Sequence, residues 1–214
     1  MASTLVSSLW QILYSDPHRM HSYGDGMKVA GIVYLHDICQ SRMIGTSRMN
    51  LDMFRKLCGD DALKNVILGT TKWGDVDRET GLRRAKHLAE TFWKEMVDHG
   101  SIITEVHATD ESAWDVINLI LHRDSVDCVL VQNEIVDHKM IIPQTTAGQG
   151  LRLTLQDALK QQKALNAQLK EEKRVKAGDE RLQQMLEDNQ KRMSSMASQI
   201  RLLKATPKRK ISGN

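Results

Sequence analysis

The sequence has no apolar run of about 20 residues, the length that a membrane-spanning helix needs. Its first ten residues lack a basic lead and a convincing cleavage site, which argues against a signal peptide. Cysteine is scarce, and Cys39, Cys58 and Cys128 are widely spaced and form no CxxC pair. We therefore expect reduced thiols and a cytoplasmic protein without a membrane span.

Charge is distributed unevenly along the 214 residues, although the net charge is only +3. Residues 1–149 carry 15 Lys and Arg against 20 Asp and Glu, a net charge of −5, whereas residues 150–214 carry 15 against 7, a net charge of +8. Two segments of opposite sign favour two structural units. The hydrophobic content of 41% is sufficient for a packed core.

Three apolar segments alternate with helical patterns before residue 150. Strands are predicted at 28–35, at 65–69 and at 101–107, and helices at 46–59, 77–100, 109–121 and 128–136. The β-α-β-α-β-α order implies parallel strands with right-handed crossovers, hence a three-layer α/β fold with a thin sheet of about three strands. The helical periodicity assigns these residues mainly to the core: Leu82, Leu88, Phe92, Trp93, Met96, Trp114, Val116, Ile117, Ile120 and Leu121.

The loop Thr71–Asp75 follows the second predicted strand and is the first place to look for a ligand, because open α/β sheets bind ligands at the carboxyl ends of their strands. It approximates the [NT]KxD motif with which P-loop GTPases read guanine, except that Asp75 comes one position late. Thr71, Lys72 and Asp75 are therefore candidate nucleotide-base contacts. His107 and Ala108, which end the next strand, are their candidate neighbours. The alternative is a solvated strand-to-helix loop with an N-cap.

Two histidine patterns receive a plainer interpretation. His36 and Asp37 end the first strand and could form an acid–base pair, but no nucleophile is close, so a satisfied loop histidine is favoured. His18 and His21 have metal-ligand spacing if helical, but no third ligand is near. We predict no catalytic residue and no metal site. An amphipathic helix is expected at 5–14.

Residues 149–206 change to Leu, Gln, Lys, Glu and Ala and are predicted to form a coiled coil. Such a narrow apolar stripe should pair with a second chain, as a homo-oligomer or with a partner helix through 151–203, or fold back as a hairpin at Gly178; a solvated single helix is the other alternative. A basic disordered tail, 207–214, follows, with a weak nuclear-localisation pattern. The two heptad seams contain Leu151, Leu155, Ala158, Gln162, Leu165 and Leu169, and then Leu182, Leu186, Asn189, Met193, Met196, Ile200 and Leu203.

Several segments, taken together, resemble a family of fungal P-loop GTPase-like proteins, in which a septin-like or immunity-associated G domain precedes a charged coiled coil. They are Tyr34-Leu35-His36-Asp37-Ile38, Gly45-Thr46-Ser47-Arg48, Met53-Phe54-Arg55-Lys56-Leu57-Cys58-Gly59 and Thr70-Thr71-Lys72-Trp73. The resemblance implies a G domain over 1–148, and GTP binding and hydrolysis in complete members.

The sequence departs from that family at the phosphate-binding elements. No GxxxxGK[ST] motif and no DxxG segment occurs in the 214 residues, so what remains corresponds to the second half of a G domain. We expect a truncated or degenerate GTP-binding protein without autonomous hydrolysis, which binds GTP or GDP weakly and does not hold Mg²⁺. The alternative is a non-catalytic oligomeric scaffold that acts through its coiled coil. A fragment from an incomplete gene model would show the same sequence features as a truncated protein. The sequence shows no specific nucleic-acid-binding pattern.

Overall fold

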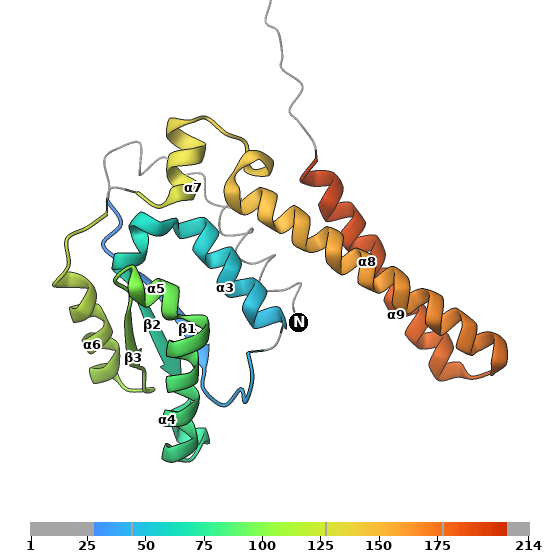
Figure 1. Ribbon diagram of the computed structural model, residues 1–214, viewed down its shortest axis with the longest axis horizontal. Helices are drawn as coiled ribbons and strands as arrows, with labels where there is room; N and C mark the ends of the chain where they lie inside the picture. The colour runs from blue at the N-terminus through green and yellow to red at the C-terminus, as the bar shows by residue number, and fades with distance from the viewer. Residues whose placement is uncertain (1–27, 44, 127, 177, 205–214) are drawn as a thin grey trace, which may run out of the picture. The chain divides into compact units, whose positions relative to one another are not determined.

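The computed structural model describes residues 28–43, 45–126, 128–176 and 178–204 (Figure 1). The expected helix at 5–14, the pair His18 and His21, and the basic tail 207–214 lie outside these residues. The chain divides into two units, Met1–Lys139 and Met140–Asn214. Among the residues that are described, no helix combines the length and the apolar character needed to cross a membrane.

A three-stranded parallel sheet organises the first unit, and the predicted α/β class is confirmed. Its strands are β1 (Ile32–Asp37), β2 (Val66–Thr71) and β3 (Ile102–Glu105), in the order β1-β2-β3. Ile32 pairs with Val66, and Ile67 pairs with Ile102. The middle strand is buried along its length up to Thr70, as expected for a parallel strand covered on both faces.

The first strand begins later than its apolar run predicts, because the preceding residues have other partners. Val29 forms an isolated antiparallel bridge with Val126, with N···O distances of 3.1 and 3.0 Å. The buried Asn65 amide donates to the carbonyl oxygens of Ala30 and Asp124 at 2.9 and 2.6 Å. The Val29 N–H and carbonyl and the Ala30 carbonyl are thus hydrogen-bonded without pairing to β2.

One face of the sheet carries the main hydrophobic core. It is covered by α3 (Gly45–Cys58), the 3₁₀ helix η1 (Asp60–Asn65), α4 (Arg78–His87), the π-helical segment η3 (Leu88–Phe92) and α5 (Lys94–Asp98). Tyr34 of β1 contacts Phe54 with ring centroids 5.0 Å apart. Leu88, Trp93 and Met96 are buried as predicted, whereas Leu82 is 47% exposed, contrary to its assignment to the core. The core cluster includes Ile38, Leu51, Leu63, Val66, Leu68, Leu88, Trp93 and Met96.

The opposite face carries α6 (Asp110–Leu121) and is only partly covered. A Cβ on Gly31 would lie 2.7 Å from Cγ2 of Ile120, so α6 packs closely against the backbone just before β1. The predicted buried stripe of α6 is wrong at Trp114, Ile117 and Leu121, which are 60%, 39% and 67% exposed. Val116 is buried and Ile120 is half-buried, as predicted, and the buried Ser112 lies on the same side of the helix. On β1, Val33 and Leu35 share the Gly31 face and are exposed.

Short helices end the first unit and open the second. The predicted helix at 128–136 is present as α7 (Leu130–Gln132) and a π-helical turn, η4 (Asn133–Asp137), and η5 (Ile142–Gln144) follows. In the second unit, α8 (Thr146–Val175) and α9 (Glu180–Leu202) pack against each other as a hairpin (Figure 1). Gly178, with φ 99°, lies in the turn, and Asp179 caps α9 by accepting from the N–H groups of Arg181 and Leu182.

The predicted seam of α9 is buried, and the predicted seam of α8 is buried at Leu151, Leu155 and Leu169 but not at Leu165. Leu182, Leu186, Asn189, Ile200 and Leu203 are buried, as the heptad pattern predicts. On α8, however, Asn166 is buried whereas Leu165 is 40% exposed, so the assignment of Leu165 to the seam is wrong. Asn166 is buried because Asn189 of α9 faces it. Nδ2 of Asn189 donates to Oδ1 of Asn166 (3.4 Å) and to the Gln162 carbonyl (3.0 Å).

Candidate functional site

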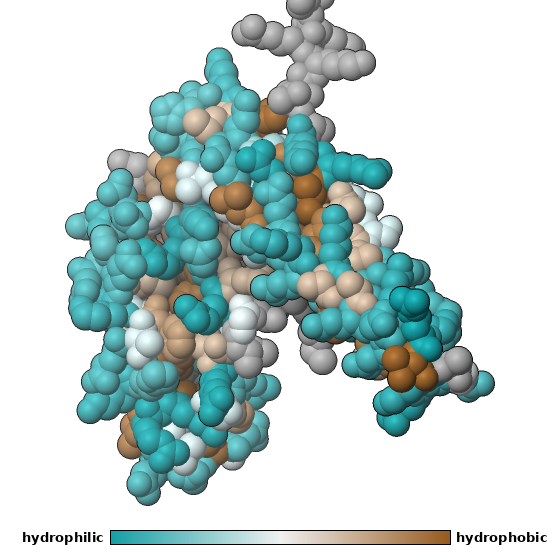
Figure 2. All heavy atoms as spheres, turned by 45° about the vertical axis from the view of Figure 1, so that its right-hand side comes forward, coloured by the Kyte–Doolittle hydropathy of each residue, from teal (hydrophilic) through white to brown (hydrophobic). Residues whose placement is uncertain are grey.

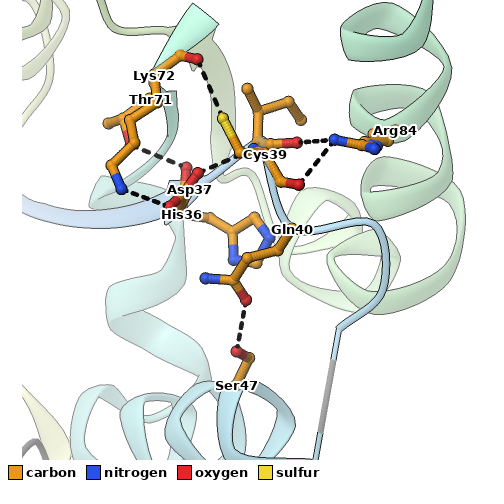
Figure 3. Close-up of polar contacts among 9 residues, drawn as sticks. His36, Asp37, Cys39, Gln40, Ser47, Thr71, Lys72 and Arg84 are labelled. Atoms are coloured by element: carbon orange, nitrogen blue, oxygen red, sulfur yellow. Dashed lines mark hydrogen bonds and ion pairs between the residues drawn. The ribbon is translucent and has the colours of Figure 1, made fainter. Parts of the chain in front are cut away.

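The carboxyl ends of β1 and β2 bring Asp37 and Lys72 together (Figure 3). Lys72 has a left-handed backbone (φ 63°, ψ 39°), and its Nζ lies 2.7 Å from Oδ2 of Asp37. The other carboxylate oxygen accepts from the Cys39 N–H at 2.9 Å, and the Cys39 thiol donates to the Lys72 carbonyl at 3.5 Å. The Thr71 hydroxyl donates to the His36 carbonyl at 3.2 Å. These bonds hold the loop that follows β2 against the end of β1.

Electrostatics reinforce this arrangement. Burial acts to raise the pKa of Asp37, but the hydrogen bonds from Lys72 and from Cys39 outweigh it and lower that pKa below its ordinary value. The hydrogen bond to Asp37 and its charge raise the pKa of Lys72. Desolvation, followed by the hydrogen bond with Asp37, raises the pKa of Cys39. A raised pKa favours the protonated Cys39 thiol, the form that donates to the Lys72 carbonyl.

A second polar cluster lies where β2 and β3 end. Trp73 is 8% exposed, and its indole N–H donates to both the carbonyl and the hydroxyl of Thr70 at 3.0 Å. The Arg78 guanidinium stacks 4.8 Å from the centre of the Trp73 ring and pairs with Glu105 at 2.5 Å. Nε2 of His107 lies 3.5 Å from the same Glu105 carboxylate. The buried indole thus fixes the loop after β2 to the end of that strand, and Arg78 connects the indole to the end of β3.

The five candidate base-contacting residues all lie at this edge of the sheet but do not form one cluster. Thr71 and Lys72 belong to the group around Asp37, whereas His107 belongs to the group around Glu105. Asp75 donates its backbone N–H to the Lys72 carbonyl at 3.1 Å, and Asp75 and Ala108 are exposed. The hydrogen-bonded carboxylate partner of Lys72 is therefore Asp37 and not Asp75.

Sequence reasoning overlooked the part that three charged residues play at this edge. Asp37 was detectable, because it ends a strand beside the Thr71–Asp75 loop, and the strand-end rule applies to it equally. Arg78 and Glu105 are 27 positions apart and carry no local signal. Their pairing depends on the register between β2 and β3, which places Glu105 opposite Thr70.

This edge presents the exposed side chains of Lys72 and Asp75 to solvent. Within the described ranges, no group of three or more His, Cys, Asp and Glu is placed to hold a metal ion. The fold and the edge together define an α/β protein with a small parallel sheet. Comparisons with protein-family models, with curated proteins and with solved structures found no match. The functional argument therefore depends on the geometry.

Proposed function

We propose that this protein is a guanine-nucleotide-binding α/β protein of the P-loop GTPase class that does not hydrolyse GTP by itself. The observation that supports it is the position of the Thr71–Asp75 loop at the carboxyl end of the central strand, with Lys72 held in a left-handed conformation beside Asp37. Open parallel sheets bind ligands at this edge. The Lys72 stem can lie along a base while its ammonium remains paired.

Binding should be weak, because the polar groups beside Lys72 are already engaged. Both oxygens of Asp37 accept hydrogen bonds, one from Lys72 and one from the Cys39 N–H. A guanine base would have to compete with these bonds or use the exposed carboxylate of Asp75, which lies one position later than the Asp of the [NT]KxD motif. Phosphate contacts normally supply much of the affinity for a nucleotide, and the sequence has no GxxxxGK[ST] loop. We expect a millimolar Kd, about −4 kcal/mol.

Titration calorimetry of the full chain with GDP tests the proposal, and a separate titration with ATP, a nucleotide with a different base, provides the comparison. Lys72→Ala should weaken GDP binding. The matched control is Lys86→Ala, which removes another exposed lysine, one paired with Glu90 at 3.8 Å. Phosphate release from GTP should not exceed the buffer rate. Micromolar GDP affinity, equal affinity for ATP, or a Lys86→Ala effect as large as that of Lys72→Ala would contradict the proposed site.

The second candidate function is a non-catalytic interaction protein that acts through its helical hairpin. The observation that favours it is a set of apolar side chains outside the buried seam. In the view of Figure 2, apolar side chains on the hairpin form small separate groups among hydrophilic ones. Leu153, Leu165, Met185 and Leu202 are 58%, 40%, 51% and 71% exposed.

Sedimentation equilibrium at tens of micromolar tests this second candidate. Self-association that is reduced by Leu153→Gln with Leu165→Gln would support it, because the α8–α9 seam is occupied within the chain and any second copy must use the outer surface. The control is Lys160→Gln with Lys163→Gln, which changes charge on the same helix. A monomer at every concentration would refute self-association.

A further inference from the structure

A cavity of about 320 Å³ opens between the loop that follows β1 and the helices α4 and η3, on the core face of the sheet. Its charged and titratable lining is entirely basic: Arg42, Arg83, Arg84, His36 and His87. No carboxylate is among its lining residues, and among the described residues these three arginines have no ion pair in the structure. Two carboxylates interact with lining residues from outside the cavity: Arg83 contributes to lowering the pKa of Asp77, and the charge of Asp37 acts to raise the pKa of His36. The cavity therefore holds positive charge without a matching anion.

Arg84 is held in place before any ligand arrives. Its Nη1 donates to the carbonyl oxygens of Ile38 and Cys39 at 3.0 and 2.8 Å (Figure 3). The guanidinium has five N–H donors in a rigid plane, so these two bonds orient the group and leave Nη2 and Nε for a ligand. A fixed fork of this kind suits the oxygens of a phosphate. Arg84 thus supplies an oriented donor at the cavity wall.

The remaining lining consists of the polar Gln40 and Ser41 and an apolar wall of Met43, Leu88 and Phe92. Leu88 and Phe92 belong to the π-helical segment η3, and Met43 ends the loop after β1. The Phe92 ring lies edge-on to His87, with centroids 5.6 Å apart, and the Arg48 guanidinium lies 5.7 Å from its centre. Single π-helical turns within α-helices are frequent at functional sites. The wall can therefore pack against a planar, mostly apolar group beside the basic residues.

The buried imidazole of His36 also lines the cavity. His36 is 5% exposed and meets the Trp93 ring edge-on at 6.0 Å. Burial lowers the pKa of His36, against the opposing influence of Asp37, so the ring is neutral near pH 7 and can donate or accept one hydrogen bond. The positive charge of the cavity then comes from its arginines.

We propose that this cavity binds a small phosphate monoester, whose phosphoryl group meets Arg42, Arg83 and Arg84 and whose flat organic part packs on Phe92. Cavities that bind small molecules start at roughly 300 Å³, so the space suits a compact ligand. Uncompensated positive charge in a concave site concentrates anions. The site is separate from the Thr71–Asp75 loop and does not depend on guanine-nucleotide binding.

Titration calorimetry of the full chain with phenyl phosphate at low ionic strength tests the proposal, with inorganic phosphate and phenol as partial ligands. Phenyl phosphate should bind at least about tenfold more tightly than inorganic phosphate, and phenol should show no saturable binding. Arg42→Gln with Arg83→Gln removes two exposed charges and should weaken phenyl phosphate binding by about tenfold or more.

The matched control is Lys86→Gln with Lys94→Gln, which removes the same charge nearby but outside the cavity. This pair should change the affinity by less than about threefold. The proposal is overturned if phenyl phosphate does not bind, if it binds no better than inorganic phosphate, or if both double variants weaken it equally. Loss of binding in Lys72→Gln would place the ligand at the Thr71–Asp75 loop and would overturn it too.

Discussion

Gly81 lies within α4 at a point where the helix touches the ring of Trp73. A Cβ at this position would lie 2.6 Å from Cζ3 and 3.0 Å from Cε3 of Trp73, and 3.4 Å from Cγ1 of Val76. The indole cannot move aside easily, because it is buried and its N–H is bonded to Thr70. The methyl group of Gly81→Ala should therefore clash with the Trp73 indole and displace it.

Two opposing effects decide the size of this change. Replacing glycine by alanine inside a helix normally stabilises by about 1 kcal/mol. Overpacking against a fixed core group costs about 1–3 kcal/mol. The steric effect should prevail, so we expect Gly81→Ala to lower the free energy of unfolding by about 1 kcal/mol. In a chain of this size, that loss corresponds to a fall in Tm of roughly 2–4 °C.

Urea denaturation monitored by tryptophan fluorescence and by far-UV circular dichroism measures the effect. Gly74→Ala is the control, because no atom lies within 4 Å of a Cβ at that position, and it should leave stability unchanged or slightly higher. In a Trp73→Phe background the ring loses the Cζ3 atom, so Gly81→Ala should cost less. If Gly81→Ala is as stable as the unsubstituted chain, or costs the same in both backgrounds, the assigned contact is wrong.

Three further predictions concern other parts of the molecule. Asn166→Leu with Asn189→Leu should stabilise the hairpin by about 1 kcal/mol, because it removes buried amides, including Oδ1 of Asn189 that lacks a hydrogen-bond partner; a lower Tm would contradict this. Burial lowers the pKa of His36 in the folded state, so stability should be constant above the unfolded value near 6.5 and should decrease as the pH falls below it. His36→Gln should flatten this dependence in thermal melts and exposed His122→Gln should not; equal slopes would refute the assignment. Leu35→Thr should raise the onset concentration of light scattering without lowering Tm, because Leu35 is 57% exposed on β1; unchanged scattering would show that this face does not drive association.

Local sequence patterns were sufficient to predict most elements and the starts of two helices. Apolar runs of strand length, separated by helical periodicity, led to the three parallel strands and the α/β class, and β2 is buried as its composition predicts. The helix starts at Asp77 and Thr109 are real N-caps, whose side chains accept from Thr80 and Ser112 backbone N–H groups. These features depend on residues within a few positions of one another, which is why the sequence alone determines them.

The tertiary structure decided which faces are covered and which charges meet. Periodicity places Trp114 and Leu121 on one side of α6, but it cannot tell which side meets the sheet, and both are exposed. In the same way, heptad spacing predicted Leu165 at a seam that instead buries Asn166, because the facing helix presents Asn189. The partner of Lys72 is 35 positions away and was decided by the register of β1 against β2, not by the nearer Asp75. Such pairings depend on contacts between residues distant in the chain, so they become visible only once the elements have packed together.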